Sequence, residues 1–245
     1  MAQQKPVERH SGVSLWRQIA DRIRVSIADG EFRETGRLPP AFELATRFGV
    51  NRHTVRAALA FLAEEGLVES IQGHGTLIVG NRQLTLPIGR RTRFSAGVGD
   101  QASSVTTRLL HSAELPAPAE IAALLRIAPE RPVIEVEEAG YVDDRPVSCS
   151  QHFFPADRFP DIAHHLIAIG SITRAFAACG LPDYLRASTE VSARHADARE
   201  RELMKLSPGA IVLEARAVNT DLDDQPVQCS RTRFSADRVS LRMTT

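Results

Sequence analysis

The chain has 245 residues, of which 43% are hydrophobic and 24% are charged, proportions typical of one or two ordinary globular domains. No apolar run approaches the ~20 residues that span a bilayer. The first residues lack the apolar core of a secretory signal, so we expect a cytoplasmic protein with no membrane partner. The three cysteines are far apart, which excludes a disulfide framework and a zinc knuckle.

The net charge of zero hides an asymmetry between the two ends of the chain. Residues 1–93 hold 14 Lys and Arg against 9 Asp and Glu, or +5, whereas residues 94–245 hold 16 against 21, or −5. A basic N-terminal region favours an anionic partner there. Random scatter of charges remains the alternative, because the bias is small.

Residues 14–65 carry the pattern of three helices. The first helix, which Gly30 ends, has one apolar stripe at Leu15, Ile19, Ile23 and Ile27. A second, short helix covers 41–48 and stops at Gly49. Asn51 is a suitable N-cap for a third helix, whose buried face would contain Val55, Leu59 and Leu62. The first turns of that helix would present Arg52, His53 and Arg56 on the opposite face.

A helix, a short turn and a second helix with basic side chains at its start indicate a helix-turn-helix. Such a helix enters the major groove end-on, so its first turn must offer donors to base edges. The next segment, LVESIQGHGTLIVG, predicts two strands around a glycine-rich turn, a wing that approaches DNA phosphates closely. The alternatives are a solvated helix face and an ordinary surface turn.

The segments LWRQIADRIRVSIADGEF, GRLPPAFELATRFGVNRHTVRAAL and GLVESIQGHGTLIV resemble the winged helix of GntR-family bacterial transcriptional regulators, over about residues 14–79. The resemblance implies operator DNA as a partner, with contacts from Arg52, Thr54, Arg56, Gly73, His74 and Gly75. One position departs from the family pattern, since Phe42 stands where a DNA-contacting Arg is usual. We therefore expect an altered operator preference.

The segment NRQLTLPIGRR, which follows the wing, has no helical or strand period. We expect residues 81–91 to be a linker between a DNA-binding domain over 1–80 and a second domain over 92–245. The second domain alternates helix-like segments with pairs of strand-like segments around turns. This pattern predicts an α+β fold with an antiparallel sheet.

The second domain contains an internal repeat. DDRPVSCSQHFFPADR (143–158) and DDQPVQCSRTRFSADR (223–238) share ten of sixteen residues. Each half would give one hairpin to the same sheet and leave a cleft between the halves. The string RTRFSA at 231–236 belongs to the repeat, whereas its copy at 91–96 does not. Chance explains the copy, or a shared use of Arg and backbone N–H groups as anion ligands.

Residues 85–243 resemble the UTRA effector-binding domain of HutC-type GntR regulators, which is similar in fold to chorismate lyase. RRTRFSAGVGDQ together with VNRHTVRAAL is most like regulators of phosphonate metabolism. The resemblance implies a phosphate site made of backbone N–H groups of Phe94, Ser95 and Ala96 and of the Ser171 hydroxyl. Ser171 also begins a predicted helix, and a helix N-terminus favours anions.

Four positions depart from the sugar-phosphate sensors of that family. Two strand arginines are replaced by Glu138 and Gly140, a sugar-binding Glu by Ser150, and a Tyr by Phe234. We expect Ser150 and Phe234 to line the effector site, but not for an amino-sugar phosphate. The remaining candidate anion ligands are Arg91, Arg93, Arg231 and Arg233, unless these side chains point to solvent.

An enzyme of chorismate-lyase-like fold, fused to a DNA-binding domain, is the main alternative. Catalysis would need an acid or base in a tuned environment, yet no histidine lies in a nucleophile or metal motif. There is no glycine-rich phosphate loop, CxxC or HExxH in the sequence. We therefore expect no catalytic residue, no metal and no cofactor.

These patterns together predict a homodimeric transcriptional regulator, acting as a repressor, that binds operator DNA and a small anionic effector such as a phosphonate or phosphate ester. A sensor of a neutral sugar or of an amino-acid-derived ligand is a further alternative. Dimerisation would place two helices in successive major-groove turns of the operator, and a constitutive architectural DNA-binding protein would not need the second domain.

Overall fold

The computed structural model describes residues 14–71, 75–79, 83–91, 98 and 101–243. The chain forms two compact units, one over 1–82 and the other over 83–245. The described residues of each unit pack around cores of their own.

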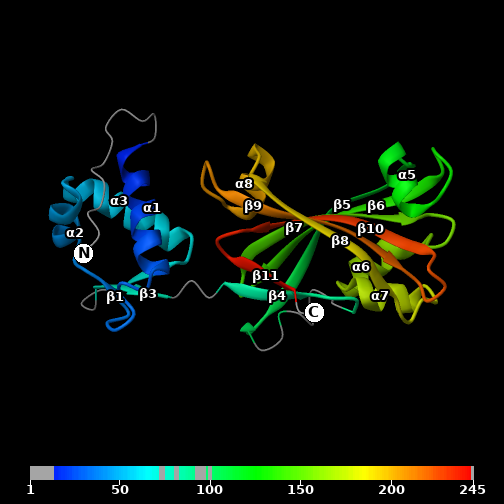
Figure 1. The fold of residues 1–245 in the computed structure, drawn as a ribbon, viewed down its shortest axis with the longest axis horizontal. Helices are drawn as coiled ribbons and strands as arrows, with labels where there is room; N and C mark the ends of the chain where they lie inside the picture. The colour runs from blue at the N-terminus through cyan, green and yellow to red at the C-terminus, as the bar shows by residue number, and fades with distance from the viewer. Residues whose placement is uncertain (1–13, 72–74, 80–82, 92–97, 99–100, 244–245) are drawn as a thin grey trace. The chain divides into compact units, whose positions relative to one another are not determined.

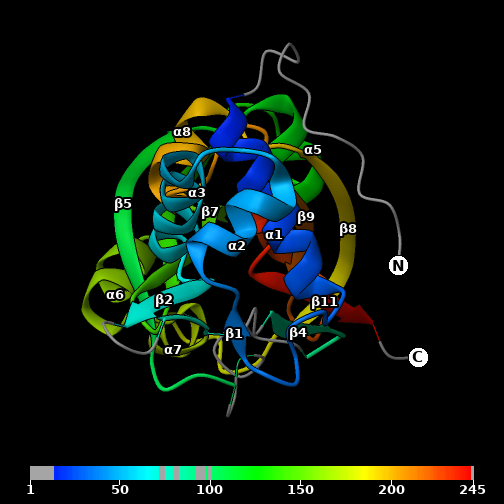
Figure 2. The same ribbon diagram turned by 90° about the vertical axis from the view of Figure 1, so that its left-hand side faces the viewer.

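Three helices and a small sheet make up the described part of the N-terminal unit (Figures 1 and 2). The helices are α1 (Leu15–Ala28), α2 (Ala41–Phe48) and α3 (Arg52–Glu64). As the sequence predicts, α2 ends at Gly49, whose φ of 64° is left-handed. At the start of α3, the Asn51 side chain accepts a hydrogen bond from the backbone N–H of Thr54 at 2.8 Å. Of the stripe predicted on α1, Ile19, Ile23 and Ile27 pack in one core with the predicted buried face of α3, whereas Leu15 is not part of that core.

The wing is a three-stranded sheet in the order β1-β3-β2. The strand β2 (Val68–Ile71) pairs antiparallel with β3 (Gly75–Ile78), and β1 (Arg37–Leu38) pairs with the other side of β3. Gly73 and His74, two of the predicted DNA contacts, lie outside the described residues. Gly75 opens β3 with a φ of 82°, a conformation that favours glycine.

The C-terminal unit is built on a six-stranded antiparallel sheet in the order β5-β6-β7-β10-β9-β8, so the predicted fold class is confirmed. Its strands are β5 (Val105–Pro116), β6 (Pro132–Val142), β7 (Arg145–Pro155), β8 (Leu185–His195), β9 (Ile211–Thr220) and β10 (Pro226–Ser235). Its helices are α5 (Ala119–Leu125), α6 (Ile162–Ile169), α7 (Ile172–Ala178) and α8 (Ala198–Met204). Figure 2 shows β5 and β8 at opposite edges of the sheet.

The internal repeat becomes an approximate twofold arrangement of the sheet. The first half is β5-α5-β6-β7 and the second is β8-α8-β9-β10, and the two halves meet where β7 pairs with β10. At the centre of that pairing Gln151 lies opposite Arg231, and these two residues occupy equivalent positions of the repeat. The helix α5 packs on β10 and α8 packs on β7, so each half places its helix on the other half's central strand.

The two faces of the sheet have different covers. In Figure 1, α5 and α8 lie on one face, while α6, α7 and a two-stranded ribbon lie on the other. The ribbon pairs β4 (Leu84–Ile88) in parallel with β11 (Val239–Met243). Alternate residues of each sheet strand therefore face either the α5–α8 side or the side of α6, α7 and the ribbon.

The expected linker over 81–91 is wrong for residues 84–88, because these form β4. Leu84 and Leu86 are buried in the core of the C-terminal unit. The pairing with β11 joins segments about 155 residues apart in the chain. The hydroxyl groups of Thr85 on β4 and Ser240 on β11 are hydrogen-bonded at 3.2 Å. The strand was missed because its five residues include a proline and are too few to show a period.

Candidate functional site

The start of α3 presents side chains to solvent. Arg52, His53 and Arg56 are exposed, and none of them forms an ion pair with another described residue. Thr54 is half-buried, and its hydroxyl donates a hydrogen bond to Oδ1 of Asn51 at 3.0 Å. Its oxygen can still accept a bond from outside, so all four predicted contact residues of this helix are close together in one turn and a half.

Other arginines of the same unit are tied to carboxylates. Arg24 contacts Asp21 and Glu65, each at 2.5 Å, and Arg47 contacts Glu31 at 2.6 Å. The guanidinium of Arg47 helps to hold the pKa of Glu31 below its ordinary value. The unit thus separates structural arginines, which are neutralised, from those on α3, which keep their charge available for an anionic partner.

A cavity of about 180 Å³ opens in the C-terminal unit, on the face of the sheet that α6, α7 and the ribbon cover. This volume is an order of magnitude above the ~10–15 Å³ that one water molecule needs. Three residues expected at the effector site line it: Ser150, Ser171 and Phe234. The remaining lining comes from the sheet strands, from β4 and β11, and from α7 and the segments before α7 and β8, which bring together parts of the chain far apart in sequence.

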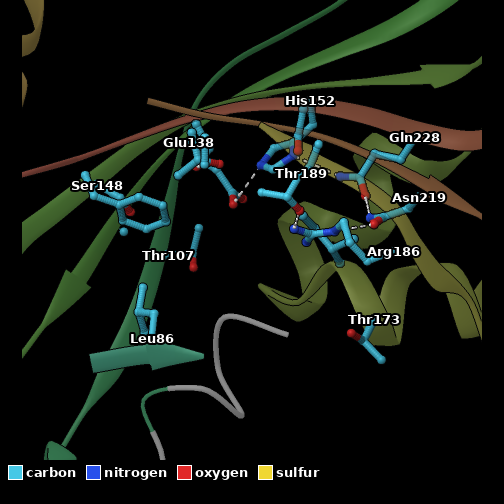
Figure 3. A pocket seen from close by; sticks show the side chains of 18 of the residues that line it. Leu86, Thr107, Glu138, Ser148, His152, Thr173, Arg186, Thr189, Asn219 and Gln228 are labelled. Carbon is cyan, nitrogen blue, oxygen red and sulfur yellow. Dashed lines mark hydrogen bonds and ion pairs between the residues drawn. The ribbon is translucent and has the colours of Figure 1, made fainter. Parts of the chain in front are cut away.

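A chain of hydrogen bonds crosses the cavity wall (Figure 3). Nε2 of His152 is 3.1 Å from Oε1 of Glu138, and Nδ1 of His152 is 2.9 Å from Nε2 of Gln228. Oε1 of Gln228 accepts from Asn219 at 2.6 Å, and Oδ1 of Asn219 accepts from Nε of Arg186 at 2.7 Å.

The chain of bonds fixes the direction of each donor. The amide nitrogen of Gln228 can only donate, so Nδ1 of His152 accepts and the ring proton lies on Nε2. His152 is then a neutral donor to the carboxylate of Glu138. A carboxylate and a guanidinium therefore stand at the two ends of one network, joined by His152, Gln228 and Asn219.

Arg186 is the cation of the cavity wall. It is half-buried, and burial lowers the pKa of its guanidinium, which still stays protonated at neutral pH. Nη1 donates to Thr189 at 3.2 Å. Within the described part of the chain, no carboxylate lies within ion-pair distance of Arg186, so its charge is met only by neutral oxygens.

The expected role of Arg233 in this cavity is corrected. On β10, Thr232 and Phe234 face the cavity, so strand alternation turns Arg231 and Arg233 to the opposite face. There Nε of Arg233 lies 3.4 Å from Glu200 and 3.8 Å from Glu214. Arg233 is part of a structural network under α8.

The other predicted anion ligands have mixed outcomes. Arg93, Phe94, Ser95 and Ala96 lie outside the described residues. Arg91 donates to Asp183 at 2.7 Å. The Ser171 oxygen accepts from the backbone N–H of Arg174 at 3.5 Å, as the N-cap of α7, which leaves its hydroxyl proton for a ligand.

Sequence reasoning missed Arg186 and the residues that hold it. Arg186 opens a strand whose pattern is mostly exposed, so nothing local marks it as a cavity residue. The repeat is the one signal that could have marked these positions. Arg186 pairs with Asn219 in the second half as Thr107 pairs with Gly140 in the first, so the two halves differ at equivalent places. Among the described residues no group of three or more His, Cys, Asp or Glu side chains could hold a metal.

No helix within the described ranges is long and apolar enough to cross a bilayer. A winged helix with exposed basic side chains at the start of α3, together with a sheet domain that contains a cavity lined by both apolar and polar side chains, is the architecture of DNA-binding regulators with an effector domain. Residues 15–78 match the family described as bacterial regulatory proteins, gntR family, and residues 100–240 match the UTRA domain. The chain belongs to the GntR family of transcriptional regulators, in the group with a UTRA effector domain.

Individual proteins agree with this membership. The chain is 54% identical, over 98% of its length and 99% of the relative, to the uncharacterized HTH-type transcriptional regulator RB1450 of Rhizobium meliloti. It is 36% identical, over 60% of its length and 61% of the relative, to the mannosyl-D-glycerate transport/metabolism system repressor MngR of Escherichia coli. The crystal structure of PhnF from Mycobacterium smegmatis shares the fold, with a TM-score of 0.63 and 23% identity over 91% of this chain and 98% of that one.

Proposed function

We propose that the protein is a homodimeric repressor that acts in the cytoplasm and whose affinity for operator DNA changes when a small anion, such as a phosphonate or phosphate ester, binds in the cavity. The observation that carries the proposal is Arg186, a half-buried guanidinium in the cavity wall that no described carboxylate neutralises. A half-buried cation of this kind is stabilised by an anionic ligand.

The hydrogen bonds around Arg186 support its role as a ligand-binding residue. Nε and Nη1 are held by Asn219 and Thr189, which fixes the plane of the guanidinium. Among the described residues, Nη2 has no acceptor within hydrogen-bond distance. A planar fork that is already oriented loses little further entropy when it binds an oxyanion.

The relatives favour regulation over catalysis. One is named as a repressor and another as a transcriptional regulator, and the described hydrogen-bond partners of His152 are Glu138 and Gln228 rather than a hydroxyl that it could activate. A neutral sugar as effector is the second candidate, which the amide and hydroxyl groups around the cavity favour. The charge of Arg186 makes the anion the better match.

Arg52, His53, Thr54 and Arg56 are the residues that we propose for direct DNA contact. Replacing Arg52 by Ala should weaken specific binding by about 1–3 kcal/mol and relax discrimination at one operator position. An operator selected from random DNA, and a scrambled duplex of the same length, supply the two measurements by fluorescence anisotropy. Equal, unchanged affinities for both duplexes would exclude Arg52 as a base-contacting residue.

The effector proposal has its own experiment. Calorimetry with phosphonates, sugar phosphates and neutral sugars should show binding of an anion, and that anion should change operator affinity by about 5–150-fold. Arg186→Gln should weaken anion binding about tenfold or more and reduce the effect on operator affinity, whereas Arg126→Gln, which removes an exposed guanidinium outside the cavity, should preserve both. Binding of neutral sugars alone would contradict the proposal. Sedimentation of the full chain tests the dimer.

A further inference from the structure

The cavity wall carries an anion as well as a cation. The ionised groups among its described lining residues are Glu138 and Arg186, since His152 is held as a neutral donor. The Glu138 side chain is 17% exposed and that of His152 is 6% exposed. An effector that enters this cavity therefore meets a carboxylate that water screens poorly.

Both charged groups have an unused hydrogen-bonding atom. Oε1 of Glu138 accepts from His152, while Oε2 has no donor within hydrogen-bond distance among the described residues. Nη2 of Arg186 likewise has no described acceptor. Neither atom is among the fully buried side-chain atoms that lack a partner, so both are open to a molecule in the cavity. A ligand group of opposite charge can bind each of them directly and form a charge-assisted hydrogen bond.

The two charges do not neutralise each other. No ion pair joins Glu138 to Arg186 in the described structure; three neutral side chains separate them in the network (Figure 3). A simple anion at Arg186 would leave the carboxylate unmatched and feel its repulsion. A simple cation at Glu138 would have the corresponding defect at Arg186. Only a ligand with both charges, set apart by a spacer, matches the two ends.

We infer that the effector is a zwitterion, with an ammonium group bound by Glu138 and a phosphonate or phosphate group bound by Arg186. This inference rests on the proposed function of the cavity as an effector site and specifies the class of effector. It gives the carboxylate at 138 a direct role in selecting ligands. It also predicts that an anion without the ammonium group is a poor effector.

The experiment uses ligands that differ in one group. Calorimetry on the full chain compares 2-aminoethylphosphonate and 3-aminopropylphosphonate with ethylphosphonate and 2-hydroxyethylphosphonate. The better aminophosphonate should bind at least tenfold more tightly than either control. The hydroxyl analogue is the stricter control, because it can donate a neutral hydrogen bond to Glu138 but cannot offer a charge.

Two variants locate the effect. Glu138→Gln keeps an oxygen that accepts from His152 and should bring the amino and hydroxyl ligands within threefold of each other. Glu137→Gln removes the same charge from the neighbouring residue, which pairs with Arg199 outside this cavity, and should keep the tenfold preference. Thermal unfolding checks that both variants fold. The comparison of ligands on the unaltered protein tests the inference even if neither variant folds.

The outcomes separate this inference from the function on which it rests. If ethylphosphonate binds as tightly as the aminophosphonates and changes operator affinity, the cavity is an anion site and the zwitterion inference is overturned. An amino preference that survives in Glu138→Gln also overturns it. If none of these phosphonates binds but a sugar phosphate binds and changes operator affinity, the inference fails and the effector proposal stands. If no anion of either series binds while operator DNA is still bound, both fail.

Discussion

The two halves of the C-terminal unit share one fold and differ in the polar side chains that they place in the cavity. Equivalent positions include Ser150 and Ser230, and Phe154 and Phe234, which are identical in the repeat. At the edge strands, however, Thr107 of the first half corresponds to Arg186 of the second. On the next strands in, Glu138 corresponds to Ala217 by the same pairing register.

This difference produces an asymmetric cavity from a nearly symmetric backbone. The first half supplies the carboxylate and the second supplies the guanidinium, so opposite charges reach the cavity from its two sides. A duplicated scaffold keeps the hairpin geometry and the cross-packed helices, while substitutions at cavity-facing positions alter only the lining. The halves can therefore be compared residue by residue, with each twin serving as the control for the other.

The largest effect is expected on the opposite face, for the twins Glu214 and Glu135. The Glu214 side chain is 7% exposed and contacts Arg194 at 2.9 Å and Arg216 at 3.0 Å, whereas among the described side chains Glu135 is hydrogen-bonded to Gln151 alone. Glu214→Ala should lower the free energy of unfolding by about 3 kcal/mol, and Glu135→Ala by about 1 kcal/mol or less. Urea denaturation measures both free energies of unfolding. Equal losses in the two variants would show that the two carboxylates contribute equally to stability.

The next effect concerns the anion site, with Arg186 and Thr107 as the twins. Arg186→Gln should weaken binding of an anionic effector about tenfold or more, since a hydrogen bond to a charged group contributes about 1.5–3 kcal/mol. Thr107→Ala, at the equivalent place in the first half, should change it by less than about threefold. Calorimetry measures both affinities. A larger loss of affinity in Thr107→Ala than in Arg186→Gln would indicate that the anion binds on the Thr107 side of the cavity.

A smaller effect is the pH dependence of stability that Glu214 adds. Burial alone would raise the pKa of Glu214, but hydrogen bonds from Arg194 and Arg216 outweigh it and hold the pKa below the ordinary 4.5. The resulting stabilisation is complete above pH about 4.5 and disappears as the pH falls through the lowered pKa. The difference in unfolding free energy between the unaltered chain and Glu214→Gln should thus shrink on acidification. A difference that is constant from pH 7 to pH 3 would refute this linkage.

The smallest difference is expected between the twin cysteines. Burial raises the pKa of Cys149 to about 11 and that of Cys229 to about 12, because each thiol is packed against a helix from the other half. A thiol-selective reagent at pH 8 should therefore leave both unmodified in the native protein, as thiolate is the reactive form. Mass spectrometry after a short exposure identifies modified sites. Labelling of one twin before unfolding would show that its half opens independently.

The sequence predicted the elements whose signals are local. Helix stripes, the Asn51 cap and the glycine stops gave α1, α2 and α3, and the repeat gave the paired hairpins. Part of the cavity was also predicted, since Ser150, Ser171 and Phe234 line it. Arg233 was placed wrongly because a repeated string does not tell which face of a strand its residues occupy, and a shift of one residue reverses the answer.

The sequence alone determined a winged helix and a duplicated antiparallel domain, because caps, periodicity and repetition act over a few residues or along one hairpin. Only the tertiary structure decided that β4 pairs with β11 and that Arg186 and Glu138 share one network of hydrogen bonds. These relations join residues tens to more than a hundred positions apart, and they depend on the order and register of strands. No short window of the chain contains that information, so the charge distribution inside the cavity emerges only when the sheet is assembled.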